Sequence, residues 1–149
     1  LDLSGNLSIQ NILIGKSKIY NDICNNLNII NDTSGVYLEQ NGNSWISYSD
    51  IRLKTNLIPI PHALDKISQI KGYYYNLKSD LSKSYVGVIA QDIQKILPEA
   101  VSINNDYLGV SYTNLIPLLI NGIQELQSQV NLLSDQNKIL MDYIEQIKQ

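Results

Sequence analysis

Hydrophobic and polar positions alternate in short runs over the first third of the chain. Up to residue 48, these runs are separated by Asn and Gly. Their apolar positions are Leu1, Leu3, Leu7, Ile9, Ile12, Ile14, Ile19, Tyr20, Leu27, Ile29, Ile30, Val36, Tyr37 and Leu38. A period of two predicts β-strands, and Asn and Gly tolerate the left-handed backbone of tight turns. Because each short strand offers few inward residues, the pattern favours a stalk intertwined with identical chains over a small independent β-sandwich.

The pattern changes after residue 54. Residues 56–61 are predicted to be extended, because each proline biases its predecessor away from the helix. The elements predicted next are a helix at 62–70, a strand at 73–75, a polar hairpin or loop at 76–84, a short helix at 91–97 ended by Pro98, and strands at 99–103 and 107–110. Residues 49–112 therefore predict a small α+β unit.

The last part of the chain has the pattern of a coiled coil. From Leu119 onward, apolar residues recur at alternating steps of four and three. The a positions are Ile123, Val130, Asn137 and Ile144, and the d positions are Leu119, Leu126, Leu133, Leu140 and Ile147. We predict one helix over residues 113–149, with Pro117 tolerated in its first turn and Thr113 or Asn114 as its cap.

In a single helix the stripe of apolar a and d residues would be exposed to water, so the pattern indicates self-association. β-branched residues at a, Leu at d and one Asn at a favour a parallel dimer. The repeat taken alone therefore predicts two chains, with Asn137 fixing their register, and a trimer needs support from elsewhere in the sequence.

Composition narrows the function classes. The chain has 149 residues, 44% hydrophobic residues and a formal net charge of -3, which suits one small domain with an appendage and disfavours nucleic-acid binding. One cysteine, Cys24, excludes an internal disulfide and a multi-cysteine metal site, and one histidine excludes a His-rich cluster. That histidine, His62, is expected to be an exposed first-turn helix residue rather than part of a Ser-His-Asp triad. We predict no cofactor and no metal.

Membrane and targeting signals are not found in the sequence. No apolar run is long enough to span a bilayer, and the N-terminus lacks the basic, apolar and small-residue order of a signal peptide. No membrane partner is therefore predicted. The first residue is Leu1 and not Met, so we expect the chain to be part of a longer protein.

The junction between the two patterns carries the candidate chemistry. A serine and a neutral lysine can form a minimal acyl-transfer pair, and Ser49 and Lys54 are five residues apart. That spacing is common by chance, and a solvated strand with one lysine is the ordinary alternative. On a strand the two would face opposite sides, so a bend or a neighbouring chain must join them. Burial or the positive charge of Arg52 would lower the lysine pKa, while Asp50 would oppose this effect.

Three blocks of sequence add a resemblance to a known family. They are SDIRLKTN at 49–56 with IPI at 58–60 and ALDKI at 63–67, then GVIAQDIQKILPEAV at 87–101, and VSY at 110–112 with LIPLL at 115–119. In this order and spacing they resemble the intramolecular chaperone domain of phage endosialidase tailspikes, the peptidase S74 family. The resemblance covers residues 49 to about 126.

The resemblance implies a self-cleaving chaperone at the C-terminal end of a viral tail fibre, tailspike or neck appendage protein. The fold class it implies is α+β: a β-rich fibre or stalk end at 1–48, then a chaperone and auto-protease domain at 49–149 made of an α+β unit (49–112) and a coiled-coil helix (113–149). The assembly is an intertwined homotrimer with the upstream fibre of the same polypeptide as its partner.

The resemblance also implies the roles of the site residues. Ser49 is the nucleophile, Lys54 is the base and the bond between Tyr48 and Ser49 is cut. The chaperone part is then released, and the fibre enters the virion after assembly in the host cytoplasm. The alternatives are a permanent trimerisation module without catalysis and, less in keeping with the fibre-like residues before Ser49, the oligomerisation module of a membrane-bound transcription factor.

Overall fold

A computed structural model describes residues 11–31 and 34–148 of the chain. It separates into two compact units, Leu1–Leu57 and Ile58–Gln149. The predicted strand positions Leu1, Leu3, Leu7 and Ile9 lie outside the described residues. The predicted domain boundary at residue 49 was placed at the expected cleavage site and not from packing, and it stays a prediction.

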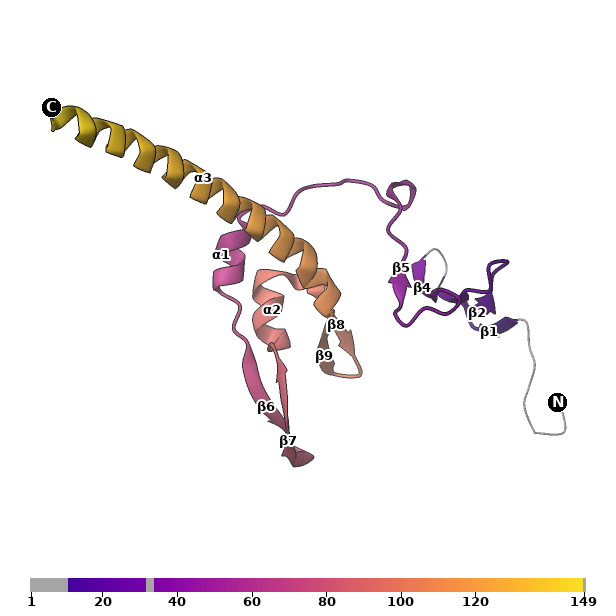
Figure 1. The fold of residues 1–149 in the computed structure, drawn as a ribbon. Helices are drawn as coiled ribbons and strands as arrows, with labels where there is room; N and C mark the ends of the chain where they lie inside the picture. Colours follow the sequence, from indigo (N-terminus) through magenta and orange to yellow (C-terminus); the bar gives the residue numbers. More distant parts are fainter. Residues whose placement is uncertain (1–10, 32–33, 149) are drawn as a thin grey trace. The chain divides into compact units, whose positions relative to one another are not determined.

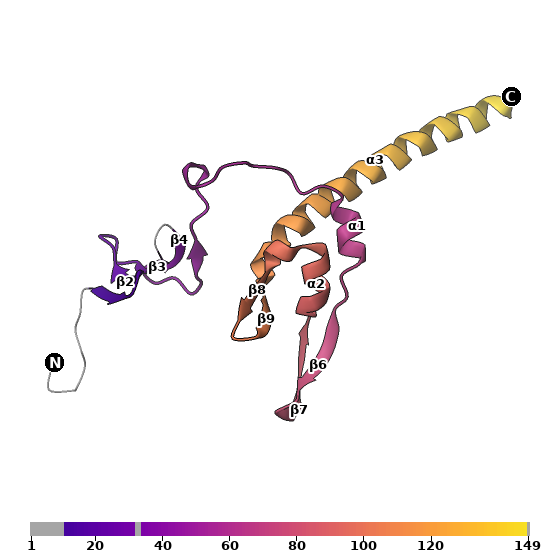
Figure 2. The ribbon, with the colours of Figure 1, turned by 180° about the vertical axis from the view of Figure 1, so that it is seen from behind.

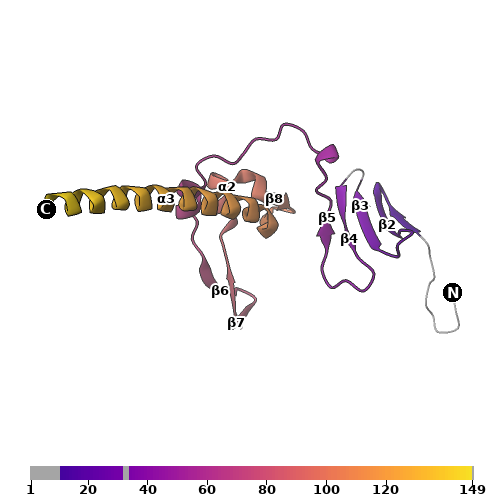
Figure 3. The ribbon, with the colours of Figure 1, turned by 45° about the horizontal axis from the view of Figure 1, so that its top comes forward.

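The first unit is an antiparallel meander in which each strand pairs with the next along the chain (Figure 3). Its strands are β1 (Asn11–Ile14), β2 (Ser17–Asn21), β3 (Leu27–Asn31), β4 (Ser34–Leu38) and β5 (Ile46–Ser47). Asn25 and Asn41 have positive φ in two of the connections, as expected for asparagine in tight turns. The β-rich prediction is confirmed for the described part of residues 1–48.

The second unit mixes short helices with two β-hairpins (Figure 1). Its elements are α1 (Ala63–Ser68), β6 (Tyr73–Leu77), β7 (Asp80–Gly87), α2 (Ala90–Ile96), β8 (Val101–Asn104), β9 (Tyr107–Val110) and α3 (Leu115–Ile147). Asn105 and Asp106, both with positive φ, form the predicted turn between β8 and β9. The α+β prediction is confirmed in type and order.

Several boundaries differ from the predicted ones, and two of the differences have a clear physical reason. β7 begins at Asp80, within the segment predicted as a polar hairpin or loop, because the strand is exposed over most of its length and needs no apolar alternation. Residues 98–100 form a 3-10 turn with Pro98 in its first position, so Glu99 and Ala100 do not begin the strand as predicted. Proline has no N–H to give to a β-ladder, so the strand starts only at Val101.

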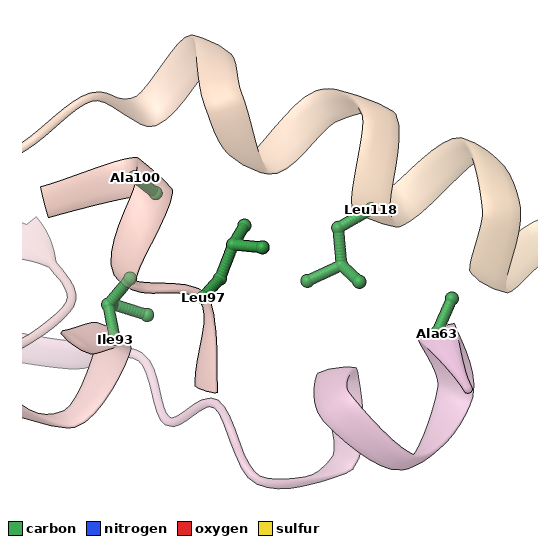
Figure 4. Packing of buried hydrophobic residues seen from close by; sticks show 5 residues of the cluster. All are labelled: Ala63, Ile93, Leu97, Ala100 and Leu118. Atoms are coloured by element: carbon green, nitrogen blue, oxygen red, sulfur yellow. The ribbon is translucent and has the colours of Figure 1, made fainter. Parts of the chain in front are cut away.

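The core of the second unit lies where α3 crosses α1 and α2 (Figure 4). Leu118 of α3 is fully buried and points between Ala63 and Leu97, with Ile93 and Ala100 completing the cluster. Gly122, one turn further along α3, is buried against Ile67, where a Cβ atom would collide with the Ile67 side chain. The first turns of α3 are therefore fixed by close packing on α1.

Glu125 adds a polar contact to this packing. Its Oε1 accepts a hydrogen bond from the Ala63 N–H at 2.8 Å, and its Oε2 accepts one from the Leu64 N–H at 2.9 Å. The carboxylate thus satisfies two N–H groups that a helix start leaves without intrahelical partners. These hydrogen bonds hold the pKa of Glu125 below its usual value.

Beyond this contact, α3 leaves the body of the second unit (Figures 1 and 2). Every described residue from 126 to 148 is exposed, including the predicted a and d positions in that range. A long C-terminal helix is thus confirmed, starting at Leu115 after a 3-10 turn at Tyr112–Asn114. Asn114 is its N-cap residue, but its side chain donates to the Glu99 carbonyl instead of capping the helix. Among the described residues, no helix combines the length and apolarity needed to cross a membrane.

Candidate functional site

A short 3-10 turn brings the serine and the lysine of the junction together. The turn covers Ile51–Leu53, and the Lys54 N–H closes it by donating to the Ile51 carbonyl at 3.1 Å. The Lys54 Nζ donates a hydrogen bond to the Ser49 Oγ at 2.7 Å. The bend that this spacing required is present within a single chain. The two groups are in the contact that a lysine base needs to take a proton from a serine hydroxyl.

Asp50 and Arg52 build the turn. The Asp50 Oδ1 accepts hydrogen bonds from the Arg52 backbone N–H at 2.8 Å and from its Nε at 2.9 Å, and the Asp50 Oδ2 lies 2.8 Å from the Arg52 Nη2. The guanidinium lowers the pKa of Asp50, and the carboxylate raises that of Arg52. Because this pair is bidentate, the positive charge of Arg52 is offset by Asp50 and is not directed only at Lys54.

The residue before Ser49 is attached to the sheet. The Tyr48 hydroxyl donates to the Asn28 Oδ1 at 2.8 Å, and the rings of Tyr48 and Tyr37 lie 5.3 Å apart between centroids. Asn28 is 1% exposed. Partial burial of the ring raises the pKa of Tyr48. The bond between residues 48 and 49 therefore joins a strand end held by side chains to an exposed turn.

A cavity of about 310 Å³ opens beside Ser49. It is lined by Asp22, Asn26, Tyr37, Glu39, Ser47, Tyr48, Ser49 and Asp50. Asp22 accepts hydrogen bonds from the Asn26 backbone N–H and side chain, and these bonds lower its pKa. Most of these residues carry polar groups and the cavity is open, so water can reach the Tyr48–Ser49 junction from this side.

The other candidates make no contact with the Ser49–Lys54 pair. His62 precedes α1 in a left-handed conformation, its side chain is 81% exposed, and its Nδ1 lies 3.9 Å from the Asp65 Oδ2. It is exposed as expected, though as the cap residue rather than in the first turn. Cys24 is exposed in a turn. Across residues 11–31 and 34–148, no cluster of His, Cys, Asp and Glu could hold a metal ion.

Asn28 was missed by the sequence interpretation. It stands between Leu27 and Ile29 in a strand, where an asparagine is easily taken for part of a turn. The sequence signal for its burial was its position in the strand, where side chains alternate between the two faces. Asn28 shares a face with Ile30, opposite the face of Leu27 and Ile29. Its partner, Tyr48, is twenty residues later in the chain. The two meet only through the pairing register of β3, β4 and β5, which the hydrophobic pattern does not specify.

The middle of the chain is similar to a known protein family. Residues 49–102 match the family model described as the chaperone of endosialidase, Peptidase S74. The matched segment begins at Ser49 and includes Lys54, α1, β6, β7 and α2.

Related sequences are long tail fibre proteins of phages. The chain is 37% identical over 91 residues to the long tail fiber protein Gp37 of Enterobacteria phage K3, a match covering 55% of this chain and 7% of that protein. It is 38% identical over 106 residues to Gp37 of Enterobacteria phage Ox2, covering 63% of this chain and 42% of that protein. The Gp37 of Salmonella phage S16 is 31% identical over 110 residues, covering 62% and 15%. The chain thus spans less than half the length of each of these relatives.

Proposed function

We propose that this chain, whose residues 49–102 match the chaperone of endosialidase family model, trimerises and guides the folding of a phage tail fibre and then cuts itself before Ser49. The observation that carries the proposal is the 2.7 Å hydrogen bond from the Lys54 Nζ to the Ser49 Oγ at the end of the β-sheet. The tail fibre relatives support a place in the phage virion.

The proposed reaction is an acyl shift followed by hydrolysis. The Ser49 Oγ attacks the Tyr48 carbonyl carbon while Lys54, as a neutral amine, accepts the hydroxyl proton. The C–N bond to Ser49 breaks, its nitrogen takes the proton, and Tyr48 is left joined to the Ser49 oxygen as an ester. Water then adds to the ester carbonyl, which frees the Tyr48 carboxylate and restores the Ser49 hydroxyl.

The exposed dyad supports a link between cleavage and assembly. Lys54 is exposed to water in the single chain. Cover from further copies of the chain would remove that water. The open heptad stripe of α3 supplies a surface on which such copies can associate. We therefore propose that Lys54 becomes an effective base after the three chains have come together.

The proposed chaperone role is kinetic. Intertwined β-rich trimers need three chain ends in register before non-local contacts stabilise them, and such searches are slow and prone to aggregation. A coiled coil at one end raises the local concentration of the three strands. Cutting it off afterwards would separate the fibre from the element that assembled it and make its unfolding hard to reverse.

Intact-mass spectrometry of freshly made protein tests the reaction. We expect fragments 1–48 and 49–149 from the unmodified chain, and one uncut chain from Ser49→Ala and from Lys54→Ala, both still trimeric by sedimentation. Ser44→Ala and Lys78→Ala, at exposed positions outside the site, are the matched controls and should be cut. Cleavage of Ser49→Ala at the unmodified rate would overturn the proposal.

A permanent trimerisation module is the second candidate. The exposed heptad positions of α3 support it without requiring any chemistry. It predicts a trimer that stays at full length in the same mass measurement. A clean dimer mass would contradict both candidates and agree with the a and d composition of the stripe.

A further inference from the structure

The side chain of Asn28 has an environment unlike that of any other described polar residue. Among the described residues, Asn28 is the one polar residue that is buried, with 1% of its surface exposed. It belongs to β3, the strand in the middle of the sheet (Figure 3). In the strand register it stands opposite Tyr20 on β2 and Tyr37 on β4. Residues directly opposite each other on neighbouring strands project to the same face of a sheet, so both tyrosines lie beside Asn28. A buried amide needs hydrogen-bond partners for both of its ends.

Those partners tie Asn28 to the cleavage junction. Its Nδ2 donates to the Asn26 carbonyl at 2.9 Å, which fixes the orientation of the amide, and its Oδ1 is left to accept from the Tyr48 hydroxyl at 2.8 Å. Asn26 is itself held by the Asp22 carboxylate. The result is a chain of hydrogen bonds from the turn before β3 to the residue that supplies the scissile carbonyl.

The backbone holds this residue less firmly. β5 ends at Ser47, and the Tyr48 N–H reaches the Gly35 carbonyl only at 3.5 Å, the outer limit of a hydrogen bond. The ring contact with Tyr37 limits the position of the Tyr48 ring but not its rotation in the ring plane. The hydroxyl contact with Asn28 is thus the shortest polar contact that locates residue 48 relative to the sheet.

We infer that Asn28 is a positioning residue for the cleavage: by holding the Tyr48 hydroxyl, it presents the Tyr48 carbonyl to the Ser49 Oγ. The inference rests on the proposed function. It also assigns the preference before the scissile bond, because tyrosine is the side chain that combines a ring for Tyr37 with a hydroxyl for Asn28. Neither residue exchanges a proton with the reacting groups.

The test is a time course of cleavage by intact-mass spectrometry after cell-free synthesis of the full chain. Tyr48→Phe keeps the ring and removes the hydroxyl, while Asn28→Ala removes the acceptor. We expect each to slow the appearance of fragment 49–149 by about 10- to 100-fold, the effect of a small misplacement of reacting atoms. The double variant should be no slower than either single one, because both remove the same hydrogen bond. Tyr107→Phe, which removes the hydroxyl of an exposed tyrosine on β9, should cleave at the unmodified rate.

A pH profile separates positioning from a general structural effect. In the Tyr48→Phe variant we expect the midpoint of the profile to be unchanged and the maximum rate to fall, with the trimer fraction kept. Cleavage of both single variants at the unmodified rate, while Ser49→Ala stays uncut, would overturn this inference and leave the proposed function standing. Additive slowing in the double variant, in step with loss of trimer, would also overturn it. An unmodified chain that is never cut would overturn both.

Discussion

The two units of this chain differ in what lies at their centre. Among the described residues of the first unit, the one buried side chain is polar, Asn28, and apolar residues such as Leu13 and Ile14 are 70% and 64% exposed. The second unit buries an apolar cluster around Ile93 and Leu118. A sheet with one buried side chain has little apolar area removed from water, whereas the second unit has a core of its own.

This difference indicates an order of assembly. A unit with a core can fold as one copy, and a sheet without one needs cover from other chains. We therefore expect the second unit to fold first, to bring copies together through α3, and so to present three sheets to one another. In this view the chaperone is the unit that can fold alone, and its client is the one that cannot.

Removing the outer part of α3 is expected to have the largest effect. Truncation after Asn131 deletes Leu133, Leu140, Ile144 and Ile147 but keeps Leu118, Gly122 and Glu125, so the core of the second unit stays whole. We expect the trimer to be lost and the β half to appear as monomer or aggregate. The trimer yield by sedimentation, in a protein that retains its upstream fibre, is the measurement.

The control for this truncation is separation after folding. The same protein, cut between Tyr48 and Ser49 once assembled, should keep its fibre trimeric. Equal trimer yields from the truncated and the post-folding cut proteins would mean that the outer helix is dispensable, and the order of assembly would be wrong.

Truncating a core side chain of the second unit is expected to have the next largest effect. Leu118→Ala removes a fully buried side chain, and such changes cost about 2–5 kcal/mol. We expect chemical denaturation followed by circular dichroism to show this loss in the free energy of unfolding. Leu132→Ala, at a site 59% exposed and outside the a and d positions, should change it by less than about 0.5 kcal/mol. Equal losses from both variants would contradict a core centred on Leu118.

The same contrast explains what the sequence could predict. The strands of residues 11–38, the short helices and the long helix were predicted because period two and period 3.6 are visible in the residues themselves. The buried face of α3 near Gly122 was not, because a glycine in a helical pattern carries no sign that Ile67 lies against it. Contacts between segments far apart depend on register and crossing geometry.

The site was predicted to a similar extent. Ser49 and Lys54 were identified from residue type and from the resemblance, and their spacing required a bend. The source of that bend, the bidentate contact of Asp50 with Arg52 across two residues, was not predicted, since Arg52 was expected to act as a free charge. The Tyr48 contact with Asn28 needed the sheet register. Local chemistry is readable from sequence, whereas the orientation that the fold imposes on it is not.

Changes to the Asp50–Arg52 ion pair are expected to have a smaller effect, on the pH dependence of cleavage. Arg52→Ala leaves the Asp50 carboxylate unpaired near Lys54, which favours the ammonium form, so cleavage should move to higher pH. Asp50→Asn frees the guanidinium, which disfavours the ammonium form, so cleavage should move to lower pH. Because both groups are exposed, we expect each midpoint to move by less than about one pH unit. Cleavage rates measured across pH check the directions, and shifts of the same sign would contradict the role of the pair.

Replacing Glu125 is expected to have the smallest effect. The effect is also the most specific, because it concerns the stability of the second unit alone. Its pKa is lowered in the folded chain from its ordinary value of 4.5 by the N–H groups of Leu64 and Ala63. A lowered folded pKa means that the unfolded chain binds the proton more readily, so the stabilising effect is present above about pH 4.5 and is lost as pH falls through the folded pKa. Glu125→Gln should therefore lower the Tm of the second unit by a few degrees at neutral pH and by much less near about pH 3. Glu145→Gln, at an exposed position of α3, should not show this difference. A Glu125→Gln deficit in Tm that is the same at both pH values would mean that the side chain acts through packing, and the carboxylate would not be what holds the start of α1.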